Sequence, residues 1–130
     1  MQNLLIKGVS NTYFTPYVSF DANTGECLIQ GESYLEESFD FYNNLMKWLN
    51  NYFSEGGQSL DLSFQLTYFN TSSSRAILEM IKLLKKHKDS GKQITINWLY
   101  PNPDDDELQM EAEDFIEESG FPMNLVEYEN

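Results

Sequence analysis

The chain has 130 residues, of which 41% are hydrophobic and 15% aromatic, so it is long and apolar enough to bury one core. Its net charge of −13 argues against binding to nucleic acid, which rewards clustered Lys and Arg, and against binding to an anionic membrane surface. Its apolar runs fall far short of the roughly 20 residues needed to span a bilayer, and we expect one domain over residues 1–130.

The first part of the chain predicts a β-hairpin. Tyr17–Asp21 and Cys27–Gln30 have the composition of strands, and Asn23-Thr24-Gly25 between them is typical of a turn. Leu4-Leu5-Ile6 is a candidate strand ahead of the hairpin. We expect Gly31–Glu36 to form a loop after it.

A helix is expected from Ser38, whose hydroxyl is available as its cap, to a stop at Gly56-Gly57. Phe39 and Trp48 lie off the centre of its apolar face, so we expect them to be partly exposed and available to a partner, although packing would use them equally well. Spacings of three and four define that apolar face, which consists of Phe41, Tyr42, Leu45, Leu49, Tyr52 and Phe53.

Strands and helices alternate in the rest of the chain. Apolar and polar residues alternate strictly over Leu60–Thr67, which predicts a strand with one buried face. The elements expected after it are a loop at 68–71, a helix that ends at Gly91, a strand at Ile94–Trp98, a helix from about Asp104 to Ser119 and a strand at Phe121–Val126.

The element order is therefore β-hairpin, α, β, α, β, α, β. This order predicts an α/β fold with a mixed sheet. Because the strands alternate rather than being continuously apolar, we expect the helices to pack mainly on one face of that sheet.

The strongest candidate site is Asn70-Thr71-Ser72-Ser73-Ser74-Arg75, where a strand passes into a helix. The first amides of a helix lack intrahelical partners and carry the positive end of the helix dipole, so they accept either a hydroxyl cap or a phosphate. Local chemistry by itself favours a simple Ser/Thr cap. The pattern Asn70-Thr71-Ser72 also matches a glycosylation site, which has no role in a chain without an export signal.

Catalytic and metal sites have little support. The acidic run Asp104–Glu107 invites a metal-dependent enzyme, but it lacks the spacing of a calcium loop and suits the first turn of a helix. His87 is the only histidine and no nucleophile motif accompanies it, so we expect no enzyme, no cofactor and no metal.

The expected compartment is the reducing cytoplasm. Met1-Gln2-Asn3 leads directly into a short apolar stretch without the basic start of a signal peptide. Cys27 is the only cysteine, so an internal disulfide is impossible, and its place in a predicted strand favours a buried thiol.

Several segments together resemble the SiaC-type biofilm-regulation phosphoproteins, over nearly the whole chain. The most specific is Tyr68-Phe69-Asn70-Thr71-Ser72-Ser73 at the start of a helix. The others are Gly31-Glu32-Ser33-Tyr34, Phe41-Tyr42 with Trp48-Leu49, Trp98 with Tyr100, and Phe121-Pro122. The resemblance implies a fold like that of STAS domains and bacterial anti-sigma-factor antagonists.

The resemblance also implies a bacterial signalling function in cyclic di-GMP control. Thr71 is then the residue phosphorylated by a partner kinase and dephosphorylated by a PP2C-type phosphatase, and the unphosphorylated form binds and stimulates a diguanylate cyclase. Asn70, Ser72, Ser73 and Arg75 are implied as partner-binding neighbours. We expect a phosphate on Thr71 to oppose docking against an acidic partner surface by repulsion and desolvation.

The chain departs from that family at Leu35, where proline is usual, at Glu37, where asparagine is expected, and at Arg75, which replaces lysine and keeps the charge. The first two changes bear on the identity of the partner more than on the switch. Two alternatives stay open: an antagonist that sequesters an anti-sigma-factor-type kinase, and a metal-dependent enzyme that uses Asp104–Glu107.

Overall fold

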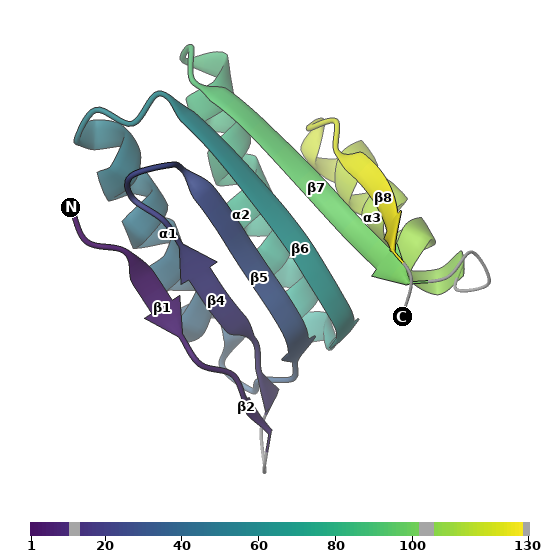
Figure 1. Ribbon diagram of the computed structural model, residues 1–130. Helices are drawn as coiled ribbons and strands as arrows, with labels where there is room; N and C mark the ends of the chain where they lie inside the picture. Colours follow the sequence, from purple (N-terminus) through teal and green to yellow (C-terminus); the bar gives the residue numbers. More distant parts are fainter. Residues whose placement is uncertain (11–13, 102–105, 129–130) are drawn as a thin grey trace.

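The structure, a computed structural model, describes residues 1–10, 14–101 and 106–128. A six-stranded sheet in the order β1-β4-β5-β6-β7-β8 forms one layer, and β2 and β3 pair separately (Figure 1). The strands are β1 Leu4–Ile6, β2 Val9–Ser10, β3 Phe14–Thr15, β4 Tyr17–Phe20, β5 Glu26–Ser33, β6 Ser59–Phe69, β7 Gln93–Pro101 and β8 Asn124–Tyr128. The helices of the described residues are α1 Ser38–Ser54, α2 Thr71–Asp89 and α3 Asp106–Ser119.

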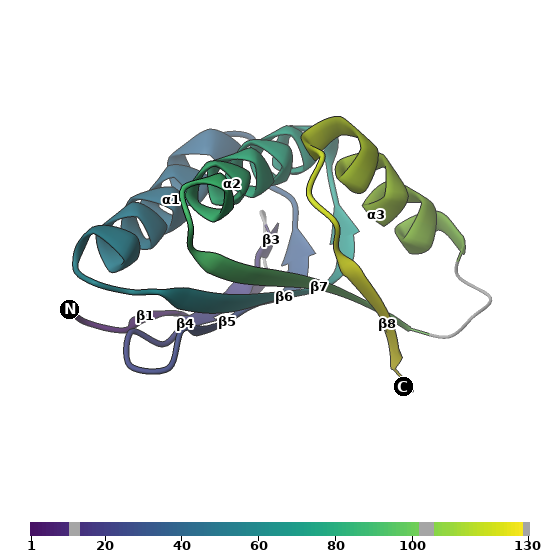
Figure 2. The same cartoon turned by 90° about the horizontal axis from the view of Figure 1, so that it is seen from above.

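The sheet is mixed. β1, β4 and β5 pair antiparallel, whereas β5, β6, β7 and β8 pair parallel through the three helical crossovers. Figure 2 shows α1, α2 and α3 on the same face of the sheet. The predicted α/β class, mixed sheet and one-sided helix layer are therefore confirmed, while β1, β2 and β3 precede the predicted hairpin and make the predicted order incomplete.

The core lies between the sheet and the helix layer. On β6 the alternating residues Leu60, Leu62, Phe64 and Leu66 are buried, because one face of a strand carries every second side chain. The same alternation buries Ile94, Ile96 and Trp98 on β7, while α1 and α2 contribute their apolar faces from above. Cys27 is also buried, as expected, and burial raises the pKa of its thiol to about 12.

Two predicted strand ends were wrong. Residues Gly31–Ser33 belong to β5 rather than to a loop, because they pair with the end of β6 across an irregularity between Gly31 and Glu32. β8 begins at Asn124 and pairs with β7, and the preceding Phe121 and Met123 are buried under the helix layer instead of starting the strand.

One prediction for α1 was also wrong, and packing, the alternative left open for Trp48, is the one that the structure shows. Ser38 does not cap the helix: Glu37 stands at the N-cap without a side-chain bond, and the Ser38 hydroxyl points inward and donates to the Leu35 carbonyl at 3.2 Å. Trp48 is only 9% exposed, because its ring packs on Tyr52 and its Nε1 donates to the Gln2 carbonyl at 2.9 Å. Phe39 is 41% exposed, as predicted.

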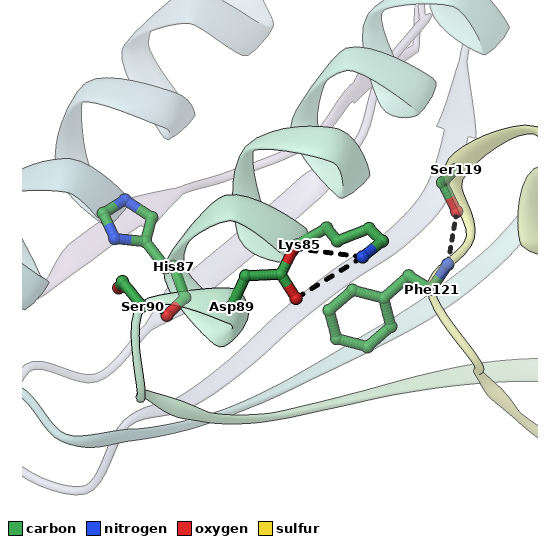
Figure 3. Close-up of polar contacts among 6 residues, drawn as sticks. All are labelled: Lys85, His87, Asp89, Ser90, Ser119 and Phe121. Carbon is green, nitrogen blue, oxygen red and sulfur yellow. Dashed lines mark hydrogen bonds and ion pairs between the residues drawn. The ribbon is translucent and has the colours of Figure 1, made fainter.

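The C-terminal end of α2 lies beside the chain that leaves α3, and each has its own local polar contacts (Figure 3). Lys85 Nζ lies 3.0 Å from Asp89 Oδ2, and the Phe121 backbone N–H donates to Ser119 Oγ at 3.1 Å. Lys88 Nζ lies 4.6 Å from the centre of the Phe121 ring, a cation–π distance. Of these contacts, the one between Lys88 and Phe121 joins α2 to the chain that leaves α3.

Candidate functional site

Asn70 connects the end of β6 to the start of α2. Its side-chain Oδ1 accepts the Ser73 N–H at 2.9 Å, so the asparagine is the N-cap of α2. Its backbone N–H donates to the Ser33 carbonyl at 3.1 Å, and its Nδ2 donates to the Leu35 carbonyl at 3.0 Å. The backbone N–H of Asn70 therefore ties the N-terminus of α2 to the end of β5, and its side-chain Nδ2 ties it to the segment that follows β5.

Four buried hydroxyls lie directly behind this cap. Ser73 Oγ lies 2.7 Å from Ser33 Oγ and 3.0 Å from Ser38 Oγ, and it also donates to the Ser33 carbonyl at 3.0 Å. The Tyr42 hydroxyl donates to Ser33 Oγ at 2.9 Å, and burial raises the pKa of this phenol. We call Ser33, Ser38, Tyr42 and Ser73 the buried hydroxyl cluster; it joins the ends of β5, α1 and α2.

Thr71 follows the cap as the first residue of α2, and its side chain is exposed. Since Asn70 already supplies the capping oxygen, the Thr71 hydroxyl is free of that role, and no hydrogen bond engages it within the part of the chain that the structure describes. Ser72 beside it is partly exposed. The first-turn amides and the helix dipole at this position favour a phosphate group.

A groove of about 430 Å³ runs between α2 and α3 and begins at Thr71. Its floor is apolar: Phe69 and Phe115 lie 6.0 Å apart by ring centres, and both rings pack on the buried Trp98. Its lining residues are Phe69, Asn70, Thr71, Ser74, Arg75, Leu78, Glu111, Asp114, Phe115 and Glu118.

The charges of this α2–α3 groove are unequal. α3 contributes the carboxylates of Glu111, Asp114 and Glu118, and α2 contributes the single guanidinium of Arg75. Partial burial, followed by repulsion from Glu107 and Asp114, raises the pKa of Glu111. The groove therefore combines an apolar floor with an acidic wall, and the exposed Thr71 is among its lining residues.

A model of SiaC family regulatory phosphoproteins matches residues 9–128. The chain belongs to the SiaC family. An uncharacterised protein of Pseudomonas aeruginosa, strain UCBPP-PA14, is 30% identical over 125 residues, which is 96% of each chain. The resemblance inferred from the sequence is thereby confirmed.

Solved structures of SiaC-family proteins share this fold. SiaC of Pseudomonas aeruginosa superimposes with a TM-score of 0.85 at 28% identity, covering 98% of this chain and 100% of the other. A second structure, of the diguanylate cyclase SiaD in complex with its activator SiaC from the same organism, contains a chain that matches with a TM-score of 0.82 at 27% identity, covering 95% and 100%. Membership in this family gives the chain a regulatory, partner-binding role.

The SiaC-family motif residues occupy three different environments. Asn70 is the cap, and Thr71 and Arg75 are exposed beside the groove, as a partner-binding surface requires. Ser72 is partly exposed but does not line the groove. Ser73 is fully buried, so its expected contact with a partner is at odds with the structure, which gives it a packing role instead.

Sequence reasoning missed Ser33, Ser38 and Tyr42 as parts of the site, and it missed the acidic wall formed by α3. The segment Gly31-Glu32-Ser33-Tyr34 did carry a signal, since it belongs to the resemblance, but the contact of Ser33 with a residue 40 positions away is not readable from spacing. The groove carboxylates of α3 lie after the acidic run Asp104–Glu107, and they were not considered from the sequence as part of a site.

The remaining candidates lie elsewhere. Asp104 and Asp105 of the acidic run fall outside the described residues, and among the described ones no group of three or more His, Cys, Asp or Glu side chains could hold a metal ion. His87 stacks on Phe53 at 4.5 Å, with Nε2 2.7 Å from Asn50 Oδ1, far along α2 from Thr71. Across the described residues, no helix is both long and apolar enough to cross a membrane.

Proposed function

We propose that this chain is a regulatory phosphoprotein that binds and modulates a diguanylate cyclase, and that reversible phosphorylation of Thr71 controls this binding. The observation that carries the proposal is the free, exposed Thr71 hydroxyl at the first position of α2, at the mouth of the groove. The complex of the SiaC relative with the cyclase SiaD supports the choice of partner. In this function the chain acts through binding rather than catalysis, in the cytoplasm.

A kinase and a PP2C-type phosphatase would act on Thr71 rather than on its serine neighbours. Ser73 has no exposed surface and three oxygen neighbours in the buried hydroxyl cluster, so a kinase would have to unfold the start of α2 to reach it. Ser72 is partly exposed and lies outside the groove, so a phosphate there would affect a groove-bound partner less. Thr71 is both exposed and part of the groove lining.

The acidic wall changes the mechanism that we expected for the phosphate. Because Glu111, Asp114 and Glu118 already line the groove, a partner surface that enters it should be basic rather than acidic. A phosphate on Thr71 would then oppose docking through its bulk and the cost of removing its hydration at the groove mouth. Arg75, one helical turn along α2, is placed to pair with that phosphate.

The test begins with a pull-down from the source cell, with and without phosphatase treatment, followed by mass spectrometry of the Thr71 peptide. The recovered diguanylate cyclase is then assayed for cyclic di-GMP synthesis with three purified forms of the chain: unmodified, Thr71→Ala, and phosphothreonine incorporated at position 71. We expect the first two to stimulate the cyclase and the phosphorylated form to fail.

The matched control is the chain with phosphoserine at position 72, which carries the same charge outside the groove. It should keep most of the stimulation. Equal stimulation by the unmodified and the Thr71-phosphorylated forms would refute control by this residue, and absence of stimulation by the unmodified form would refute the cyclase as partner.

A further inference from the structure

Within the described part of the chain, no ion pair engages the carboxylates of the acidic wall of the α2–α3 groove. Among the described residues the ion pairs are Lys82 with Glu79 and Lys85 with Asp89, and neither includes a groove carboxylate. Glu111 is partly buried, and its raised pKa reflects the cost of holding a charge there beside other acids. A cation brought into the groove would relieve that cost.

The floor of the groove limits what kind of cation fits. Phe69, Leu78 and Phe115 form an apolar base below the carboxylates, in a volume of about 430 Å³. A small hydrated metal ion gains nothing from such a base. The side chain of arginine or lysine matches both parts, because its aliphatic stem packs on apolar and aromatic surface while its charged head reaches the carboxylates.

We propose that the α2–α3 groove is the docking site for a basic segment of the partner protein, with an arginine or lysine side chain lying over Phe69 and Phe115 and paired with Glu111 and Asp114. This proposal rests on the proposed function and names the chemistry that the partner brings to the same site. Charge complementarity selects the occupant: the wall carries three carboxylates against one guanidinium, that of Arg75 at the groove mouth.

The position of Thr71 would let its phosphorylation control binding at this docking site. Thr71 and Arg75 share the groove lining with the acidic wall, so a phosphate on Thr71 enters the space through which the basic segment passes. Pairing of that phosphate with Arg75 would hold it at the mouth. The bulk of that phosphate would narrow the groove for the basic segment, and its pairing with Arg75 would offset part of its attraction for the positive charge of the segment.

Peptides of defined charge test the groove without the cyclase. The probe is the acetylated, amidated peptide Leu-Arg-Gly-Leu-Arg-Gly, and its control replaces arginine with citrulline, which has the same shape and no charge. Backbone amide NMR shifts of the isotope-labelled full chain report the binding site. We expect saturable shifts at Leu78, Glu111 and Phe115 with the arginine peptide alone. No shifts at these residues, or the same shifts with citrulline, would overturn the proposal.

Paired variants then separate the acidic wall from the general acidity of α3. Glu111→Gln/Asp114→Asn removes two groove charges, whereas Glu113→Gln/Glu117→Gln removes two exposed charges that do not line the groove. The groove variant should bind the arginine peptide, and the cyclase, at least about fivefold more weakly and with less dependence on salt, while the control variant binds like wild type. Equal losses in both variants would overturn the proposal.

The two proposals fail in distinguishable ways. If the unmodified chain stimulates a cyclase but the groove variant does so equally well, the basic segment does not dock in this groove and the proposed function stands. If the arginine peptide binds the groove as expected but no cyclase responds to the chain, the docking chemistry stands and the choice of partner is wrong. Thermal unfolding of each variant confirms that the comparison is made between folded proteins.

Discussion

The hydroxyl oxygens of Ser33 and Ser73 lie 2.7 Å apart, and neither residue has any exposed surface. This contact joins the last residue of β5 to the third residue of α2, directly behind the exposed Thr71. Buried hydroxyls are stable only when they are hydrogen-bonded, so the cluster fixes where the first turn of α2 sits. The position of Thr71 is therefore fixed by residues that are themselves buried.

Replacing Ser73 by alanine should destabilise the fold by about 1–3 kcal/mol, because the change removes the buried hydroxyl that bonds to the side chains of both Ser33 and Ser38. Urea unfolding followed by circular dichroism measures the effect. The matched control is Ser72→Ala, one residue away and partly exposed, which should change stability by less than about 0.5 kcal/mol. Equal unfolding midpoints for the two variants would contradict a structural role for the cluster.

Tyr42→Phe removes one hydroxyl from the same cluster and retains the ring. Its loss should cost about 1 kcal/mol, since the phenol donates to Ser33 Oγ at 2.9 Å in the interior. Combined with Ser73→Ala, the double variant should lose less than the sum of the two single losses, because both residues bond to Ser33. A double-mutant cycle in urea measures this coupling, and strict additivity would mean that the hydroxyls act independently.

The sequence predicted an element correctly where a single hydrophobic periodicity determined its type and its buried face. The alternation of Leu60, Leu62, Phe64 and Leu66 placed β6 and its buried face, because side chains of a strand alternate between two faces. At Gly31 the prediction was wrong, because the residues from Gly31 to Ser33 were expected in a loop and belong to β5. A glycine normally weakens a strand, but here it takes φ +108° beside the irregularity in β5, and only pairing with the distant β6 keeps the strand going.

The site was predictable in part. The predicted residues Asn70, Thr71 and Arg75 lie in one segment of the sequence, and in the structure they line one groove. The buried serines behind this segment could not be predicted, because a serine at the start of a helix is normally interpreted as its cap. Ser38 and Ser73 instead bond to each other across 35 positions of sequence. The acidic wall was also out of reach, since only the packing of α3 against α2 brings Glu111 near Arg75.

Asn70→Ala should destabilise the start of α2 by about 1–2 kcal/mol, because it removes the oxygen that caps Ser73 N–H. Asn70→Asp retains that oxygen and loses only the amide donor to the Leu35 carbonyl, so it should recover part of the loss. Thr71→Ala should change stability by less than about 0.5 kcal/mol, since Thr71 is exposed and is not the cap. A larger loss for Thr71→Ala than for Asn70→Ala would reverse the assignment of the cap.

Glu111→Gln should stabilise the protein at neutral pH. The pKa of Glu111 is raised in the folded state, chiefly by partial burial and then by Glu107 and Asp114, so the ionised carboxylate is held less favourably in the folded chain than in the unfolded one. This cost exists when the group is ionised in both states, above its folded pKa, and it disappears below the unfolded value of 4.5, where both states are protonated.

The melting temperature of Glu111→Gln should therefore exceed that of wild type at about pH 7, and the difference should shrink as the pH falls toward about 4. Scanning calorimetry over this range measures it, with Glu113→Gln as the exposed control on the same helix, for which little difference is expected at either pH. If a basic segment docks in the groove, saturating the chain with the arginine peptide should stabilise wild type more than Glu111→Gln. The melting-temperature advantage of Glu111→Gln at neutral pH should therefore shrink or reverse, because the cation then supplies the counter-charge that Glu111 lacks.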